Sequence, residues 1–226
     1  MNIDIFSLFP DWFDWFAEQR HVRNALASGL ALDFVDLRAT TPLRAGQVDD
    51  TPYGGGAGMV VRVDVVEAAM KARYGGPRLA PERVVALSAG GRQFDDALAT
   101  ELAAEPAIAL LCGRYEGFDE RVNEHLATDV VSIGPYVLAG GELAAMVLCD
   151  AVIRKLPNAL GHVDSAVEES FSEALGGAPE YPHYTRPVEW QGHRVPDVLL
   201  SGDHARVAEW RREKSRERAR ARGRGA

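Results

Sequence analysis

The sequence contains only two cysteines, Cys112 and Cys149, which lie far apart and form no CxxC pair. This pattern points to neither a disulfide framework nor a zinc site, although a role for Mg²⁺ stays open. Apolar runs are short, and none approaches the roughly 20 residues that a membrane span needs. The N-terminus, MNIDIFSLFP, has no basic region before its apolar residues, so it predicts a first strand rather than a signal peptide. We therefore expect a protein of the reducing cytoplasm with no membrane partner.

The chain of 226 residues, 46% of them hydrophobic, is long enough to form one large domain and a small one. Its net charge of −8 is unevenly distributed. Residues 206–226 contain nine Lys or Arg and three Glu, a net charge of +6, which leaves −14 for the preceding residues. A basic end on an acidic body is typical of nucleic-acid contact, because phosphate binding releases counterions. The alternative is a solvated C-terminal helix.

Apolar strand patterns alternate with helical patterns over most of the first 160 residues. Strands are predicted at 2–8, 31–37, 83–87, 107–111 and 130–133, and helices at 63–73, 95–104, 119–126 and 142–154. The last three strands are mainly apolar along their length, which is typical of a parallel sheet buried on both faces by helices. The predicted fold class is therefore α/β.

Gly-rich turns follow three of these strands: SAGG from Ser88, CGRYEG from Cys112 and SIGPYVLAGGELAAM from Ser132. In parallel sheets, ligands bind at the carboxyl ends of the strands, and all three turns fall there. Glycine leaves backbone amides and carbonyls accessible, and proline stiffens the third turn. The turns together predict one ligand pocket, in which Tyr115 and Glu116 are able to hydrogen-bond a sugar or a base.

The segment 38–59 shows no periodicity and contains the glycine run PYGGGAGM from Pro52 to Met59. It has neither the GK[ST] of a phosphate loop nor the preceding strand of a dinucleotide fingerprint. We predict a mobile loop that closes over a substrate, and the alternative is a flexible surface turn.

The character of the chain changes after Pro157. Residues 161–182 are polar and acidic with weak periodicity, so they predict an interdomain linker that orders on binding. Residues 183–226 predict a small, mostly helical C-terminal domain, whose basic helix begins near Asp203. The predicted organisation is thus a domain at 1–160, a linker at 161–182 and a domain at 183–226.

Seven motifs occur in an order and spacing that resemble one known family. They are SLFP from Ser7, PYGGGAGM, LLCGRYEGFDERV, SIGPYVLAGGELAAM, LGHVDSAVEESF from Leu160, PHYTRP from Pro182 and VPDVLLSGDHA from Val195. Together they cover nearly the whole chain and are similar to those of the bacterial tRNA (guanine-N1)-methyltransferases of the SPOUT superfamily. The resemblance implies a parallel sheet with a deep trefoil knot, a feature otherwise almost absent from proteins.

The resemblance also implies S-adenosylmethionine as the methyl donor, bent among the three turns. The donor contacts that it carries over are Leu87, Ser88, Gly113, Tyr115, Glu116, Ile133, Gly134, Pro135, Tyr136, Val137, Leu138, Gly140 and Gly141. It further implies a homodimer, with each active site between the knot of one subunit and the linker and C-terminal domain of the other. The expected product is N1-methylguanosine immediately 3′ of the tRNA anticodon, at position 37.

Methylation at guanine N1 requires a base, because N1 carries a proton at neutral pH. By resemblance the base is Glu169, where the family usually has aspartate, and Glu168 is a second candidate. Arg154 matches the arginine that stabilises negative charge on O6. The positions that match contacts with the tRNA are Asp50, Gly55, Gly56, Ser165 and His183. The target base must leave the anticodon loop, where unstacking costs little.

Two other functions stay open at this point. A ribose methyltransferase of the same superfamily would need no base of this kind. A non-catalytic RNA-binding protein could have kept the ligand pocket alone. The arginine at position 154 and the acidic residue at position 169 argue against that second alternative.

Overall fold

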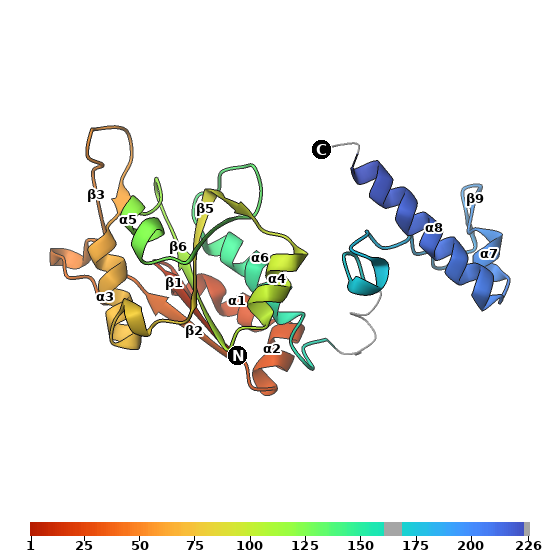
Figure 1. Ribbon diagram of the computed structural model, residues 1–226, viewed down its shortest axis with the longest axis horizontal. Helices are drawn as coiled ribbons and strands as arrows, with labels where there is room; N and C mark the ends of the chain where they lie inside the picture. Colours follow the sequence, from red (N-terminus) through yellow and green to blue (C-terminus); the bar gives the residue numbers. More distant parts are fainter. Residues whose placement is uncertain (161–168, 224–226) are drawn as a thin grey trace. The chain divides into compact units, whose positions relative to one another are not determined.

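A computed structural model describes residues 1–160 and 169–223 of the chain. The chain divides into two compact units, 1–160 and 161–226, which we describe separately (Figure 1). Two residues named above, Ser165 and Glu168, lie outside the described residues. Within the described ranges, no helix is both long enough and apolar enough to cross a membrane.

A five-stranded parallel sheet forms the centre of the larger unit (Figure 1). Its strand order is β2-β1-β6-β5-β7, in which every neighbouring pair is parallel. The strands are β1 (Asn2–Ser7), β2 (Ala31–Asp36), β5 (Arg83–Gln93), β6 (Ala107–Cys112) and β7 (Asp129–Ser132). The predicted α/β class and the parallel sheet are therefore confirmed.

Helices cover both faces of this sheet. Side chains alternate along each strand, so Ile108 and Leu110 pack in one apolar cluster while Ala109 and Leu111 pack in the other. One cluster includes residues of α2 (Arg20–Ala27), α4 (Asp96–Ala103) and α6 (Glu142–Ile153). The other includes residues of α3 (Val63–Tyr74) and α5 (Glu120–His125). Short helical turns complete the unit at η1 (Pro10–Phe13), α1 (Asp14–Ala17), η2 (Arg44–Gly46) and η3 (Pro77–Leu79).

The turn predicted after the strand at 83–87 is wrong. Strand β5 continues through these residues to Gln93, with a register shift between Leu87 and Arg92. Both of these residues pair with Val131 of β7, so the extra residues form a bulge. The backbone at Gly91 passes against Val130 and Val131 so closely that a Cβ there would lie 2.6 Å from the neighbouring backbone. Glycine permits this approach where a side chain would not.

The predicted irregular segment 38–59 contains a short strand that the sequence did not indicate. Strand β3 (Asp49–Asp50) pairs antiparallel with β4 (Val60–Val61). The glycine run lies between them and is exposed, with positive φ at Gly54, Gly55, Gly56 and Gly58. The pairing of β3 with β4 holds the two ends of the glycine loop beside each other.

The smaller unit is built around helix α8 (His204–Arg222), whose N-terminus is capped by Asp203. Ser215 on this helix donates to the carbonyl oxygen of Pro179 at 2.7 Å, and Arg218 donates to that of Glu180 at 2.6 Å. The remaining elements are η5 (Glu173–Leu175), the antiparallel pair β8 (Glu189–Trp190) and β9 (His193–Arg194), and α7 (Asp197–Leu200). The end of the predicted linker thus contacts the basic helix within this unit.

A buried carboxylate ties α3 to the first strand. Asp4 accepts from Tyr74 Oη at 2.5 Å and from Arg73 Nη2 at 2.7 Å. Burial and the nearby Asp4 carboxylate raise the pKa of Tyr74 well above its ordinary value, so the phenol stays protonated and donates. Arg73 Nη2 also contacts Asp33 at 2.6 Å, where the carboxylate side chain is 52% exposed. The same guanidinium therefore has one buried and one exposed partner.

Replacing Asp4 with asparagine is expected to lower the free energy of unfolding by about 1–3 kcal/mol, because charge-assisted hydrogen bonds to a buried group are lost. Asp33→Asn is the matched control, and it should cost less than about 1 kcal/mol since its ion pair is solvated. Urea unfolding measures both values, provided that the dependence of the free energy of unfolding on urea concentration is the same in all three proteins. Equal losses in the two variants would contradict the role assigned to the burial of Asp4.

Candidate functional site

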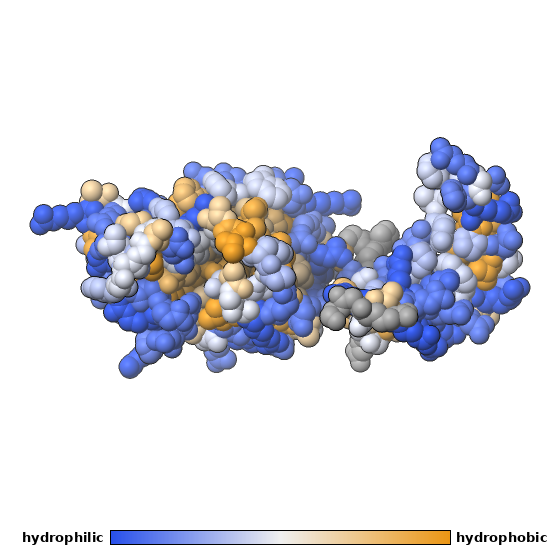
Figure 2. Space-filling view, turned by 90° about the horizontal axis from the view of Figure 1, so that it is seen from above, coloured by the Kyte–Doolittle hydropathy of each residue, from blue (hydrophilic) through white to orange (hydrophobic). Residues whose placement is uncertain are grey.

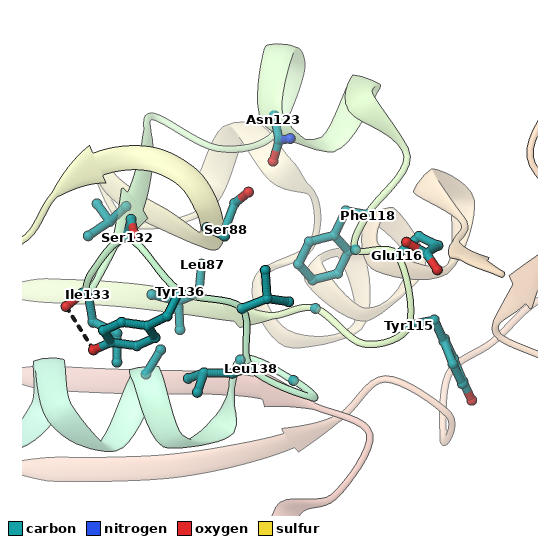
Figure 3. A pocket seen from close by; sticks show the side chains of 18 of the residues that line it. Leu87, Ser88, Tyr115, Glu116, Phe118, Asn123, Ser132, Ile133, Tyr136 and Leu138 are labelled. Carbon is teal, nitrogen blue, oxygen red and sulfur yellow. Dashed lines mark hydrogen bonds between the residues drawn. The ribbon is translucent and has the colours of Figure 1, made fainter. Parts of the chain in front are cut away.

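A pocket of about 240 Å³ lies where the three Gly-rich segments meet at the carboxyl edge of the sheet (Figure 3). Strands β5, β6 and β7 bring these segments together although they are far apart in the sequence. The lining residues are Leu87, Ser88, Ala89, Gly113, Tyr115, Glu116, Gly117, Phe118, Glu120, Asn123, Val131, Ser132, Ile133, Gly134, Tyr136, Val137, Leu138, Gly140, Gly141 and Ala144. The single pocket predicted from the sequence is therefore present at the predicted edge.

The segment 113–118, which we call the second turn, is held on one side by strand β4. The amide of Glu116 donates to the carbonyl of Met59 at 3.0 Å, and the amide of Val61 donates to the carbonyl of Gly117 at 2.9 Å. Tyr115 adopts a left-handed backbone conformation, with φ of 60°, which is uncommon for a residue with a side chain. The two hydrogen bonds connect the end of the glycine loop to the second turn, which lines the pocket.

The segment 133–141, which we call the third turn, lies against the second. The amide of Gly141 donates to the carbonyl of Gly113 at 2.8 Å. A Cβ at Gly141 would lie 2.8 Å from Cys112 Cα, so only glycine fits at this contact. At the other end of the turn, Tyr136 Oη donates to the carbonyl of Ile133 at 3.0 Å (Figure 3). The third turn is therefore anchored to the second turn at its C-terminal end, and an internal hydrogen bond closes its N-terminal end.

The pocket combines apolar walls with bare backbone. Leu87, Ile133 and Leu138 supply apolar surface, while Gly113 and Gly140 present main-chain groups without side chains. Such a lining suits a flat heterocycle whose edges hydrogen-bond to main-chain groups. Two carboxylates, on Glu116 and Glu120, also line the pocket and are available to hydroxyl groups or to positive charge. The residues present therefore fit a cationic nucleoside.

The thiol below the pocket is not a nucleophile. Cys112 is completely buried at the end of β6. Burial raises the pKa of its thiol well above the ordinary value, and the negative charge of Glu142 adds to the shift. The thiol therefore stays protonated near pH 7, whereas a nucleophilic attack would require the thiolate.

The predicted donor contacts lie together. All of them except Pro135 line the pocket. The sequence did not single out Phe118 and Asn123 as lining residues, although both occur close after the second Gly-rich motif. Ser132 was also missed as a contact, and its hydroxyl caps the third turn by donating to the carbonyl of Gly134 at 3.0 Å. The signal for this role in the sequence is the position of a serine directly before the third turn.

A second hollow adjoins the pocket, because Phe118 and Glu120 line both. Asp50 lines this second hollow, and Arg62 Nη1 contacts its carboxylate at 3.3 Å. Arg62 also makes two hydrogen bonds with Asp64, at 3.0 and 2.8 Å, so the guanidinium is held on two sides. Gly55 and Gly56, in contrast, lie on the exposed loop and do not line the hollow.

The remaining predicted residues within the described ranges are divided between the two units. Arg154 is the C-terminal cap of α6 and is partly buried in the larger unit. Glu169 is partly buried and belongs to the smaller unit. His183 in that unit is exposed, contacts Glu180 at 2.7 Å and lies beside the ring of Tyr181. Across 1–160 and 169–223, no three His, Cys, Asp or Glu side chains are grouped so that they could hold a metal ion.

Comparison with known proteins gives a consistent result along the chain. Residues 1–224 match the model of the family described as tRNA (Guanine-1)-methyltransferase TrmD. A tRNA (guanine-N(1)-)-methyltransferase of Brevibacillus brevis is 47% identical over 224 residues, which cover 98% of this chain and 89% of the relative. Proteins of the same name from Listeria monocytogenes serotype 4a and Sorangium cellulosum are 44% and 45% identical, over 96% and 94% of this chain and 88% of each relative.

Gly141→Ala is expected to lower the free energy of unfolding by about 1–3 kcal/mol, because the new methyl group would overlap the backbone of Cys112 and Gly113. Gly90→Ala is the matched control, since a Cβ there meets no atom within 4 Å. That control should be neutral within about 0.5 kcal/mol. Denaturant unfolding measures both, and an unaffected Gly141→Ala would contradict the close contact between the turns.

Proposed function

Because the chain belongs to the tRNA (guanine-N1)-methyltransferase family, we propose that it transfers a methyl group from S-adenosylmethionine to N1 of the guanosine at position 37 of tRNA. The observation that carries the proposal is the meeting of the three Gly-rich segments in one pocket. S-adenosylmethionine, when bound, supplies a methyl group already activated by the sulfonium. The protein must therefore bind and orient the donor and the acceptor.

In this proposal the third turn holds the adenine and the two carboxylates face the polar parts of the donor. Apolar side chains at Leu87, Ile133 and Leu138 are suited to the ring, and main-chain groups at Gly134 and Gly140 to its edges. Glu116 and Glu120 offer oxygen atoms to ribose hydroxyls and negative charge to the cationic end. From the family membership we also propose that residues 1–160 contain a trefoil knot.

The acceptor enters through the second hollow, which shares Phe118 and Glu120 with the donor pocket. Asp50 is held there by Arg62 and is available to the target nucleotide. The exposed loop with Gly55 and Gly56 is available to the flanking nucleotides. The guanine leaves the anticodon loop to reach the methyl group, and in a single-stranded loop this step costs little.

Glu169 removes the proton from guanine N1, which makes that nitrogen nucleophilic. As the proton leaves, negative charge develops on O6, and the guanidinium of Arg154 stabilises it. Both side chains are partly buried, which strengthens such interactions relative to bulk water. The carboxylate belongs to the smaller unit and the guanidinium to the larger.

A homodimer would complete the site by bringing the smaller unit of one subunit to the larger unit of its partner. Support comes from large apolar side chains that remain exposed on adjoining elements of the larger unit, at Trp12, Trp15, Leu143 and Val147. In the view of Figure 2, hydrophobic residues form a patch near the middle of this unit. We propose that a second copy of the chain covers the exposed side chains of η1, α1 and α6.

The smaller unit contacts tRNA through helix α8, in a C-terminal domain formed by residues 183–226 and joined by a linker at 161–182. Arg206, Arg212 and Arg216 on α8 are exposed and available to phosphates. Other basic residues of α8 make contacts within the unit: Arg211 lies over the ring of Tyr181, and Arg218 donates to the carbonyl of Glu180. His183 lies in the same unit, where it is exposed to a bound RNA.

The most direct test is to incubate the full chain with labelled S-adenosylmethionine and an unmodified tRNA transcript with guanosine at position 37. We expect labelled N1-methylguanosine after digestion, and no product from the matched transcript with adenosine at that position. A methylated ribose would instead indicate the other kind of methyltransferase. The absence of any labelled nucleoside would indicate an RNA-binding protein without this activity.

Glu169→Gln is expected to lower kcat by at least about tenfold while donor affinity stays nearly unchanged, because the amide cannot accept the N1 proton. Glu189→Gln, in strand β8 of the same unit, is the matched control and should retain its activity. Single-turnover kinetics and donor titration measure the two effects. If Glu169→Gln is fully active while Glu168→Gln is not, the base has been assigned to the wrong carboxylate.

A further inference from the structure

A buried ion pair joins the two turns that form most of the donor pocket. Arg114 follows Gly113 in the second turn, and Glu142 begins α6 directly after the third turn. Arg114 Nε and Glu142 Oε2 are 2.9 Å apart, and the two side chains are only 13% and 1% exposed. The N–H is not aligned with the oxygen, so the contact is an ion pair rather than a well-formed hydrogen bond. Neither side chain is among those that line the pocket.

The end of strand β1 and the segment that follows it, including η1, hold the two members of this pair. Ser7 Oγ donates to Glu142 Oε1 at 2.8 Å and accepts from the amide of Phe9 at 2.9 Å. The guanidinium of Arg114 lies over the rings of Phe9 and Trp12, with Cζ 4.4 and 4.5 Å from their centroids. A planar guanidinium stacked on aromatic rings has a fixed orientation, which an ammonium group would not have.

The third turn rests directly on this guanidinium. Arg114 and Gly140 form an antiparallel bridge, and Arg114 Nη1 donates to the carbonyl of Ala139 at 3.4 Å. A Cβ at Gly140 would collide with Arg114 Nε and would lie 2.6 Å from Glu142 Oε2. Gly140 itself lines the pocket. A displacement of the guanidinium would therefore shift a wall of the pocket.

A contribution to stability alone does not account for this arrangement. Removing two charges from water costs free energy that their attraction often only offsets, and apolar residues of similar size can be equally stable. The geometry of the pair, in contrast, defines where Gly113 and Gly140 lie. We propose that the Arg114–Glu142 pair is a positioning device, which holds the second and third turns in the conformation that binds the methyl donor. The inference rests on the proposed function, which supplies the donor.

The chain offers a matched ion pair away from the pocket. Asp4 and Arg73 are 2.7 Å apart, and the side chain of Asp4 is 5% exposed. Neither residue lines the pocket or belongs to its turns. Arg73→Met therefore also leaves a buried carboxylate without its guanidinium partner, but in a place where the donor pocket is not affected.

The experiment compares donor affinity with stability in the full chain. Calorimetric titration with S-adenosylmethionine and thermal unfolding are measured for wild type, Arg114→Met, Glu142→Gln, the double variant Arg114→Met/Glu142→Gln, and Arg73→Met. We expect each of the two single changes in the pair to weaken donor binding by about tenfold or more, because misplaced turns lose contacts with the donor. Arg73→Met should lower the melting temperature while changing donor affinity by less than about twofold.

The double variant separates positioning from stability. With no charge left unpaired, its melting temperature should return toward that of the wild type. Its donor affinity should stay about tenfold weaker, because nothing fixes the turns. Recovery of donor affinity together with the melting temperature would overturn the proposal, as would folded single variants that bind donor like the wild type. If the wild-type protein itself fails to bind S-adenosylmethionine, the proposed function is wrong, and that result is distinct from a failure of the pair.

Discussion

The close contact between two stretches of backbone, at Gly113 and Gly141, is the constraint on which the rest of the site depends. The amide of Gly141 donates to the carbonyl of Gly113, and the backbone of Cys112 and Gly113 leaves no space for a Cβ at Gly141. Because of this contact, the end of one strand and the start of α6 form adjacent walls of one pocket. The second turn also hydrogen-bonds to Met59 and Val61, so the second hollow, which we propose as the acceptor site, is linked to the same contact.

The sheet, the Gly-rich turns and the proposed reacting groups occupy separate parts of the structure. The parallel sheet, buried on both faces, fixes the ends of three strands. The turns then offer main-chain groups that need no side-chain reorganisation to bind the proposed donor, and in our proposal the charged residues Arg114 and Glu142 fix the turns. The two groups that we propose for the reaction itself lie outside these turns: the carboxylate of Glu169, which takes the proton, and the guanidinium of Arg154, which stabilises the charge on O6. In the proposed homodimer, an acceptor site that the smaller unit of the partner completes would allow a large tRNA to enter before the reacting groups meet.

Much of the fold could be predicted from the sequence because its signals are local. Short, mainly apolar runs such as 83–87 and 107–111 are typical of strands buried on both faces of a sheet, and the pattern from Glu142 onward is that of a buried helix. The lining of the pocket followed from Gly-rich motifs at strand ends and from the family resemblance. The continuation of β5 and the β3–β4 pair were missed, because strand pairing depends on a partner distant in the sequence. Arg114 was missed as well, since an arginine after a glycine looks like a surface cation until Glu142 is placed beside it.

Hydrogen–deuterium exchange of the full chain, with and without S-adenosylmethionine, tests the central claim that the three Gly-rich segments form the donor site. The account predicts that the donor slows exchange in peptides covering 86–91, 112–118 and 132–141, because their main-chain groups become hydrogen-bonded or shielded from water. Unchanged exchange in these three peptides, with protection appearing only in the glycine loop or in α8, would contradict it.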